Sequence, residues 1–200
     1  MQGRVSPMSM SDIVQQARWS GIAACIGGAM YEVKAGVILV GGDQPPLLFE
    51  AAPIAFGVSL LLFGGLFSGR LAQAGSIVAL VVLIAAVANV LEEILFDREL
   101  VPWLSSMIDA ISGFGPFVGL LLVGWASRHQ WAPLAAHHVG PLAVAGLYPL
   151  SILLMVPLAF AVDLDGARGE RLIELPILLI GIGWAAFGGS LVAAPALHHP

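Results

Sequence analysis

The chain has a single cysteine, Cys25, and this scarcity excludes two kinds of site. One thiol forms no intrachain disulfide and builds no metal centre from cysteine ligands. None of the five histidines lies in a long apolar segment, which argues against haem held between helices. A Gly-rich phosphate loop, a nucleophile elbow and a basic stripe are also missing. We therefore predict no metal site, no cofactor and no nucleic-acid partner.

Charge is scarce as well. Charged residues make up 10% of the 200 residues, whereas in soluble domains they make up about a quarter. Hydrophobic residues reach 58%, and the mean hydropathy is +0.94. This composition excludes an ordinary soluble domain. The length instead suits about six spans of roughly 20 residues joined by short loops.

The sequence thus predicts an all-α polytopic membrane protein, a six-transmembrane-helix bundle embedded in a lipid bilayer. We predict a polar N-terminal tail over 1–17, a single membrane domain over 18–194 and a C-terminal tail over 195–200. The predicted spans are 18–40, 47–68, 71–95, 104–126, 141–162 and 172–193. The first span carries Glu32 and Lys34 and lacks an A-x-A cleavage site, so we interpret it as a retained helix rather than a signal peptide.

Pairs of small residues four positions apart occur along the predicted spans. They allow helix backbones to approach closely where lipid provides no hydrophobic drive for association. Such pairs serve packing within one bundle or between two copies of the chain. The sequence does not distinguish these roles, so a homo-oligomer is an open alternative. The pairs are Ala24 and Gly28, Gly65 and Gly69, Gly115 and Gly119, and Ala185 and Gly189.

The three predicted hairpins share a weak pattern that suggests an internal repeat. Each has an acid just inside its returning helix, followed by a proline or glycine. Repeats of this kind are common in transporter folds. The acids are Glu50, Asp109 and Glu174, and the residues that follow them are Pro53, Gly113 and Pro176.

Assigning the loops alternately to two sides separates the charges. The side of the N-terminus has one acid, Asp12, and the other twelve of the thirteen acids lie on or near the opposite side. The first side also carries Arg4, Arg18, Arg70 and Arg128. Because basic loops tend to stay in the cytoplasm, we expect a multi-pass protein of the cell membrane with both termini cytoplasmic.

Glu92 and Glu93 lie at the far end of the third predicted span, where ionisable groups are usually kept for function. They are about 100° apart on a helix, so at most one points straight into the bundle. Asn89 lies three and four residues before them, close enough to hydrogen-bond either. Two crowded carboxylates raise each other's pKa, which would allow one to hold a proton. With Asp109, they are our candidate catalytic residues.

Glu32 and Lys34 are the charged residues of the first span. They point about 200° apart on a helix, so each needs a partner from another helix. Lys34 and Glu50 lie at similar depths in adjacent spans, and we predict an ion pair between them. Glu32, Lys34, Glu50, Asn89 and Glu174 are our candidate substrate-binding residues.

Two short matches suggest enzymes. Glu92-Glu93-Ile94-Leu95-Phe96-Asp97-Arg98 resembles the EExxxR signature of the CPBP (Abi) family of intramembrane metalloproteases, with the arginine one residue later. That family also has a histidine motif, for which this chain offers only His129. Our topology places His129 on the side of the membrane opposite to Glu92 and Glu93. Asn89-Val90-Leu91-Glu92-Glu93-Ile94-Leu95-Phe96 also resembles the Asn-xxx-Glu helix of the integral membrane terpene cyclases, which use carboxylates as acids.

These features favour an acidic cavity in the outward half of the bundle. It would bind or transport a small cationic or amine-bearing solute, with proton exchange at a carboxylate. One alternative is an intramembrane enzyme that uses a protonated carboxylate as general acid on a lipid-soluble substrate. Another is a non-catalytic subunit of a membrane complex. The sequence leaves enzyme activity open.

Overall fold

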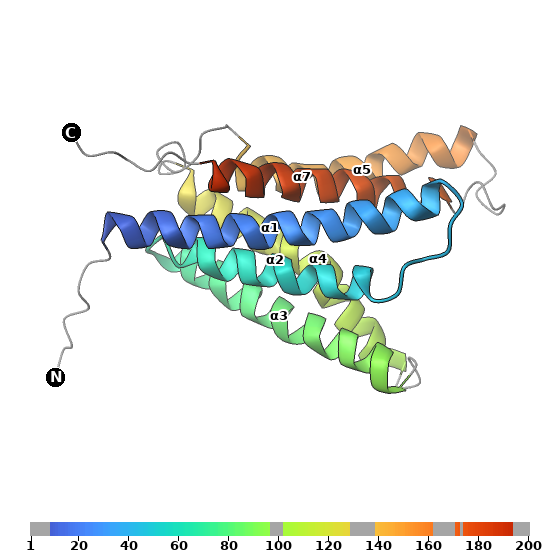
Figure 1. Cartoon of the computed structure of the whole chain (residues 1–200), viewed down its shortest axis with the longest axis horizontal. Coiled ribbons are helices and arrows are strands. Elements are labelled where there is room, and N and C mark those ends of the chain that lie inside the picture. The colour runs from blue at the N-terminus through green and yellow to red at the C-terminus, as the bar shows by residue number, and fades with distance from the viewer. Residues whose placement is uncertain (1–8, 97–101, 129–138, 162–170, 173, 194–200) are drawn as a thin grey trace.

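The computed structural model describes residues 9–96, 102–128, 139–161, 171–172 and 174–193 (Figure 1). Within these residues the chain is all-helical, as predicted. The helices are α1 (Met10–Leu39), α2 (Leu48–Gly64), α3 (Arg70–Phe96), α4 (Pro102–Ser127), α5 (Pro141–Ala161) and α7 (Glu174–Val192). Four of them, α1, α3, α4 and α7, are long and apolar enough to cross a membrane. The apolar helical stretches Leu48–Gly64 and Pro141–Pro157 are shorter.

The first helix begins at Met10 rather than near Arg18, so residues 10–17 of the predicted tail are helical. A capping box explains the earlier start. Ser9 Oγ accepts a hydrogen bond from the Asp12 backbone N–H, and the Ser9 N–H donates to Asp12 Oδ2, each at 3.2 Å. Residues 1–8, and the C-terminal tail predicted over 195–200, lie outside the described residues.

The second helix starts without a side-chain cap. Its N-cap residue is Leu47, which makes no capping hydrogen bond with its side chain. Leu47 has φ of 63°, in the left-handed region. This conformation costs a residue with a Cβ about 1 to 2 kcal/mol, and it sets the direction in which α2 starts.

The helices run lengthwise between two chemically different ends of the bundle. α1, α3 and α5 finish at one end, where α2, α4 and α7 begin (Figure 1). We call this the acidic end, after Glu50, Glu92, Asp109 and Glu174. The other is the basic end, after Arg18, Arg70 and Arg128. The first residue of α1 and the last of α7 both lie at the basic end, which agrees with an even number of helices.

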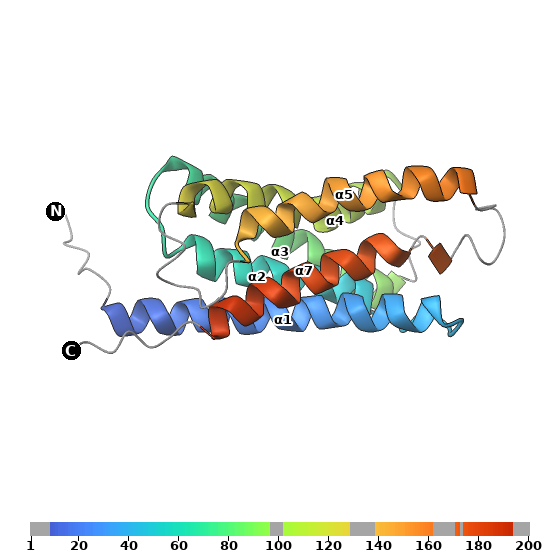
Figure 2. The same cartoon turned by 90° about the horizontal axis from the view of Figure 1, so that it is seen from above.

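The helices α1 and α7 lie side by side in both views (Figures 1 and 2). Glycines form their contact. A Cβ on Gly21 would lie 2.6 Å from the carbonyl oxygen of Gly188, and one on Gly28 would lie 2.6 Å from that of Gly181. At these positions backbone therefore meets backbone, and a side chain added to any of the glycines would not fit. We call these four glycines the glycine seam.

The predicted small-residue pairs serve packing within the bundle at several positions. Ala24 and Gly28 lie on the α1 face that meets α7. On α4, a Cβ at Gly115 would strike Val82 of α3, and one at Gly119 would strike Leu60 of α2. A role between copies of the chain stays a prediction, because the structure is of one copy.

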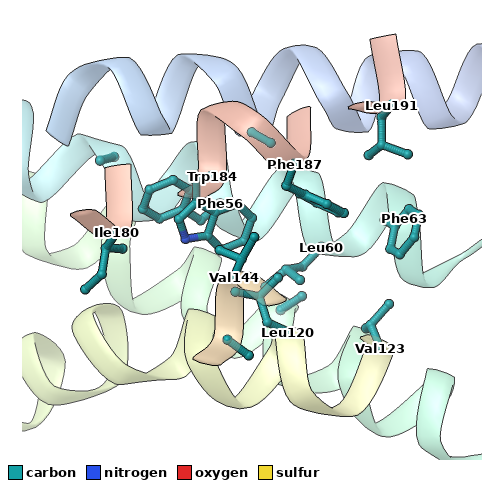
Figure 3. Packing of buried hydrophobic residues seen from close by; sticks show 14 of the residues in the cluster. Phe56, Leu60, Phe63, Leu120, Val123, Val144, Ile180, Trp184, Phe187 and Leu191 are labelled. Atoms are coloured by element: carbon teal, nitrogen blue, oxygen red, sulfur yellow. The ribbon is translucent and has the colours of Figure 1, made fainter. Parts of the chain in front are cut away.

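Aromatic rings fill the centre of the bundle. Phe56 of α2 stacks on Trp184 of α7 with ring centroids 4.2 Å apart. Phe63 and Phe187 meet edge to face at 5.3 Å. These rings and Leu120 of α4 are fully buried (Figure 3). Because each such ring pair adds about 0.5 to 1.5 kcal/mol beyond its buried area, the core holds α2, α4 and α7 together.

Candidate functional site

A buried ion pair lies near the acidic end. Lys34 Nζ of α1 donates hydrogen bonds to Glu174 Oε1 and Oε2 of α7, at 2.7 and 2.8 Å. Both side chains are almost entirely shielded, with exposed fractions of 6% and 11%. A charge at this depth is tolerated only when it is paired and hydrogen-bonded, and each side chain satisfies the other.

The predicted partner of Lys34 was Glu50, and that prediction was wrong. The glycine seam explains the choice. Gly21 and Gly28 face Gly188 and Gly181, and this fixes one antiparallel register for α1 and α7. Continuing the register by six residues from Gly28 brings Lys34 opposite the first turn of α7, where Glu174 lies. All four glycines are visible in the sequence, but only the packing of the helices shows which of them face each other.

Two aromatic rings connect the ion pair to the interior. Lys34 Nζ lies 4.8 Å from the centroid of the Phe49 ring, and Phe49 stacks on Tyr31 with centroids 5.5 Å apart. Glu50, only 2% exposed, lies in the first turn of α2 and is close enough to Tyr31 to interact with it electrostatically. The ammonium and the two rings thus form one continuous group, and Glu50 lies next to Phe49 in the chain.

Tyr31 and Phe49 also line a cavity of about 430 Å³ between α4 and the helices α1, α2, α5 and α7. Ligand pockets for small molecules have a similar size, and they combine apolar walls with a few placed polar groups. Asp109 is the one charged side chain on its described lining. The remaining lining residues are Ala110, Gly113, Phe114, Tyr148, Ser151, Ile152, Pro176, Ile177 and Ile180.

The polar groups of the cavity are hydroxyls and one carboxylate. Tyr148 OH accepts a hydrogen bond from Trp184 Nε1 at 3.1 Å, so its own proton can be donated to a ligand. Ser151 Oγ donates to the Tyr148 carbonyl at 2.8 Å, and its oxygen can still accept. The carboxylate of Asp109 is exposed at the rim. Ser151 Oγ and Asp109 can therefore accept hydrogen bonds from a positively charged group, and Tyr148 can donate to an acceptor on the ligand.

The sequence analysis missed Tyr31, Tyr148 and Ser151. One signal was present, because the chain has only two tyrosines, and both line the cavity. A tyrosine within an apolar helix needs a partner for its hydroxyl, and this could have marked both positions.

A second polar cluster lies between α3 and α4. The Ser105 hydroxyl donates to Glu92 Oε1, and Glu92 is only 3% exposed. Asn89 Nδ2 lies 3.5 Å from Ser112 Oγ, at the limit of a hydrogen bond. The Asn89 amide therefore reaches across to α4 rather than to Glu92 or Glu93. None of these residues lines the cavity, so the cluster joins two helices and is separate from it.

The structure divides the candidate residues into groups. Lys34 and Glu174 form the ion pair, with Glu50 near Tyr31. Asn89 and Glu92 belong to the second cluster, and only Asp109 lines the cavity. Glu93 is half-buried beside fully buried Glu92, as the 100° offset predicted, and Glu32 is half-buried on α1. The described cavity is therefore not the acidic one predicted from all these residues, which stays a prediction.

No group of three or more His, Cys, Asp or Glu side chains that could hold a metal ion occurs in the part of the chain that the structure describes. The five histidines, at 129, 137, 138, 198 and 199, lie outside that part. The prediction of no metal site therefore stays a prediction for the loops and tail that carry them.

The long apolar helices indicate a helical membrane protein, and a cavity of about 430 Å³ lies between them. Comparison with known proteins adds no narrower assignment. No family model matches the chain, no curated protein matches it in sequence, and no solved structure matches it in fold.

Proposed function

We propose that this membrane protein binds a small amphiphilic amine in the cavity between α4 and α5 and moves it across the bilayer. The observation that carries the proposal is the lining of the cavity, where one carboxylate, Asp109, is combined with aromatic and aliphatic side chains. The sequence analysis expected a mainly acidic cavity for a cationic solute. Because most of the lining is apolar, we propose in addition that this solute has a substantial hydrocarbon part.

The chemistry of the lining suits an ammonium group. Four aromatic rings belong to it, those of Tyr31, Phe49, Phe114 and Tyr148. A cation held over such a ring gains about 0.5 to 1 kcal/mol at an exposed site and about 2 kcal/mol when desolvated. Asp109 supplies the opposite charge. An anionic ligand would meet this carboxylate without a lining cation to offset it.

Transport requires the helices to separate on the side of the cavity that faces the basic end. Phe117 of α4 and Tyr148 of α5 meet there, with ring centroids 5.4 Å apart. We propose that these rings separate during translocation and that Asp109 exchanges its proton for the amine. In proteoliposomes, the rate of amine uptake should then depend on a pH gradient. An equal rate with and without the gradient would contradict proton coupling.

Amine selectivity provides the first test. In non-ionic detergent micelles, octylamine should raise the melting temperature of the purified protein more than octanol or octanoate at equal concentration, because binding to the folded state stabilises it. Asp109→Asn should weaken octylamine binding about tenfold, since a charge-assisted hydrogen bond is worth about 1.5 kcal/mol at least. Octanol binding should not change.

Asp43→Asn is the matched control. It removes the same charge from an exposed residue between α1 and α2, so octylamine binding should keep its wild-type strength. Equal stabilisation by octylamine and octanoate, or an amine preference that survives Asp109→Asn, would rule out the proposed ligand class.

An intramembrane enzyme is the second candidate, because a carboxylate at the rim of an apolar cavity also suits a general acid acting on a lipid-soluble substrate. Asp109 would then carry the proton. Glu92 and Glu93, the other candidates for that role, do not line the cavity. An enzyme should consume its substrate in detergent, where no gradient exists, whereas a transporter should bind the substrate and release it unchanged.

We further propose that all six helices cross the membrane, with the acidic end outside and both termini in the cytoplasm. The arginines at the basic end support this orientation. The threefold repeat also stays a proposal. Glu50 and Glu174 lie in the first turns of α2 and α7, which agrees with a repeat, whereas Asp109 lies two turns into α4.

A further inference from the structure

We infer that the ligand enters the cavity sideways from the hydrocarbon of the bilayer, through an opening between α4 and α5 at Phe114 and Ile152. This inference rests on the proposed function for the identity of the ligand. It adds the route and narrows the ligand class to amines that partition into lipid.

The packing of α4 against α5 shows where the opening begins. The two helices run antiparallel. A Cβ on Gly124 of α4 would lie 2.8 Å from the Leu142 side chain of α5, and Phe117 meets Tyr148 one step closer to the acidic end. The next step in this register brings Phe114 level with Ile152. There the helices enclose the cavity, and beyond it their acidic ends diverge (Figure 1).

Phe114 and Ile152 face two environments. Both line the cavity, and both are largely exposed on the outside of the bundle, at 61% and 56%. Gly113, also on the lining, has open space where a Cβ would be. A side chain that is exposed and yet lines a cavity marks a place where the cavity meets the surroundings.

The position of this opening along the helices identifies those surroundings. Phe114 lies about 18 Å along α4 from Pro102, at roughly 1.5 Å per residue, in a helix about 39 Å long. Ile152 lies about 17 Å along α5 from Pro141 by the same rise. Both are near the middle of their helices. In a bilayer with a hydrocarbon core about 30 Å thick, the opening faces acyl chains.

Asp109 lies closer to the acidic end, about 10 Å along α4 from Pro102. A ligand entering at Phe114 would therefore place its amine toward Asp109 and its hydrocarbon part toward the opening. Membrane-inserted amphiphiles have the same orientation, with the polar group nearer the surface. Short polyamines without a hydrocarbon part do not match this arrangement.

Site-specific quenching tests the route. Gly113→Cys in a Cys25→Ala background would carry a bimane label in proteoliposomes. Phospholipids brominated in mid-chain should quench this label severalfold more than aqueous iodide, because the label samples acyl chains. Added octylamine should reduce the quenching by brominated lipid.

Gly146→Cys is the matched control. Gly146 is exposed on α5, also has open space at its Cβ and does not line the cavity. Brominated lipid should quench this label with or without octylamine. Quenching at position 113 by iodide alone, or by neither quencher, would overturn the lipid route. Octylamine could still stabilise the protein in detergent, so failure of the route is distinct from failure of the proposed ligand.

Discussion

Replacing Lys34 with methionine should lower the free energy of unfolding by about 3 to 5 kcal/mol, the usual cost of leaving one member of a buried ion pair without its partner. Glu174 would keep a carboxylate in a site where only 11% of its side chain is exposed. Chemical unfolding in mixed micelles, followed by far-UV circular dichroism, measures the change. Glu174→Gln alone should lower stability in the same direction.

The double variant Lys34→Met with Glu174→Gln separates this effect from simple disruption. It removes both charges while keeping the volumes similar, and such replacements are often neutral or stabilising. Its stability should therefore exceed that of either single variant. A double-mutant cycle between Lys34 and Glu50 should show a smaller coupling energy. If the Lys34 and Glu50 cycle gave the larger value, the ion pair would be assigned to the wrong acid.

The glycine seam leads to the second large effect. Gly188→Ala should cost about 1 to 3 kcal/mol of folding free energy, the usual penalty for overpacking. The new methyl group would meet the Gly21 carbonyl oxygen and stand 2.6 Å from Cys25 Sγ. Backbone atoms cannot rotate away, so α1 and α7 must separate. The same unfolding measurement applies.

Gly189→Ala is the control next to it in the chain. A Cβ at Gly189 has nothing within 4 Å, and alanine favours a helix over glycine by up to about 1 kcal/mol. This variant should therefore be as stable as wild type or more so. If both alanine variants had the same stability, close contact along the seam would not hold the two helices together.

The helices themselves followed closely from the sequence. Apolar runs of this length, broken by Pro, Gly and charged turns, predicted every described helix, and the third ends at Phe96 against a predicted 95. The first begins at Met10 against a predicted 18, because the Ser9 capping box lies among polar residues that hydropathy does not identify as helical. The second ends at Gly64 against a predicted 68. Four of the six helices are long and apolar enough to cross a membrane, and the crossing of all six stays a prediction.

The candidate site was harder to predict, for a geometric reason. Depth along the membrane favoured Glu50 as the partner of Lys34. The rotation and register of α1 against α7, which depth does not give, select Glu174 instead. The cavity depends on the spacing between α4 and α5, and the sequence of one helix alone does not determine that spacing. Glu92 and Glu93 were predicted as site residues because they are charged. The tyrosines of the cavity carry no formal charge, so the same criterion does not identify them.

The ion pair also has a consequence for how the protein is made. Lys34 and Glu174 are 140 residues apart in the chain, and a ribosome adding about 5 to 20 residues per second needs about 7 to 28 s to span that interval. During this time α7 is not yet synthesised, so the Lys34 ammonium lacks its Glu174 partner and the glycines of α1 have no helix to pack against. We expect the nascent chain to need help from the insertion machinery until α7 arrives.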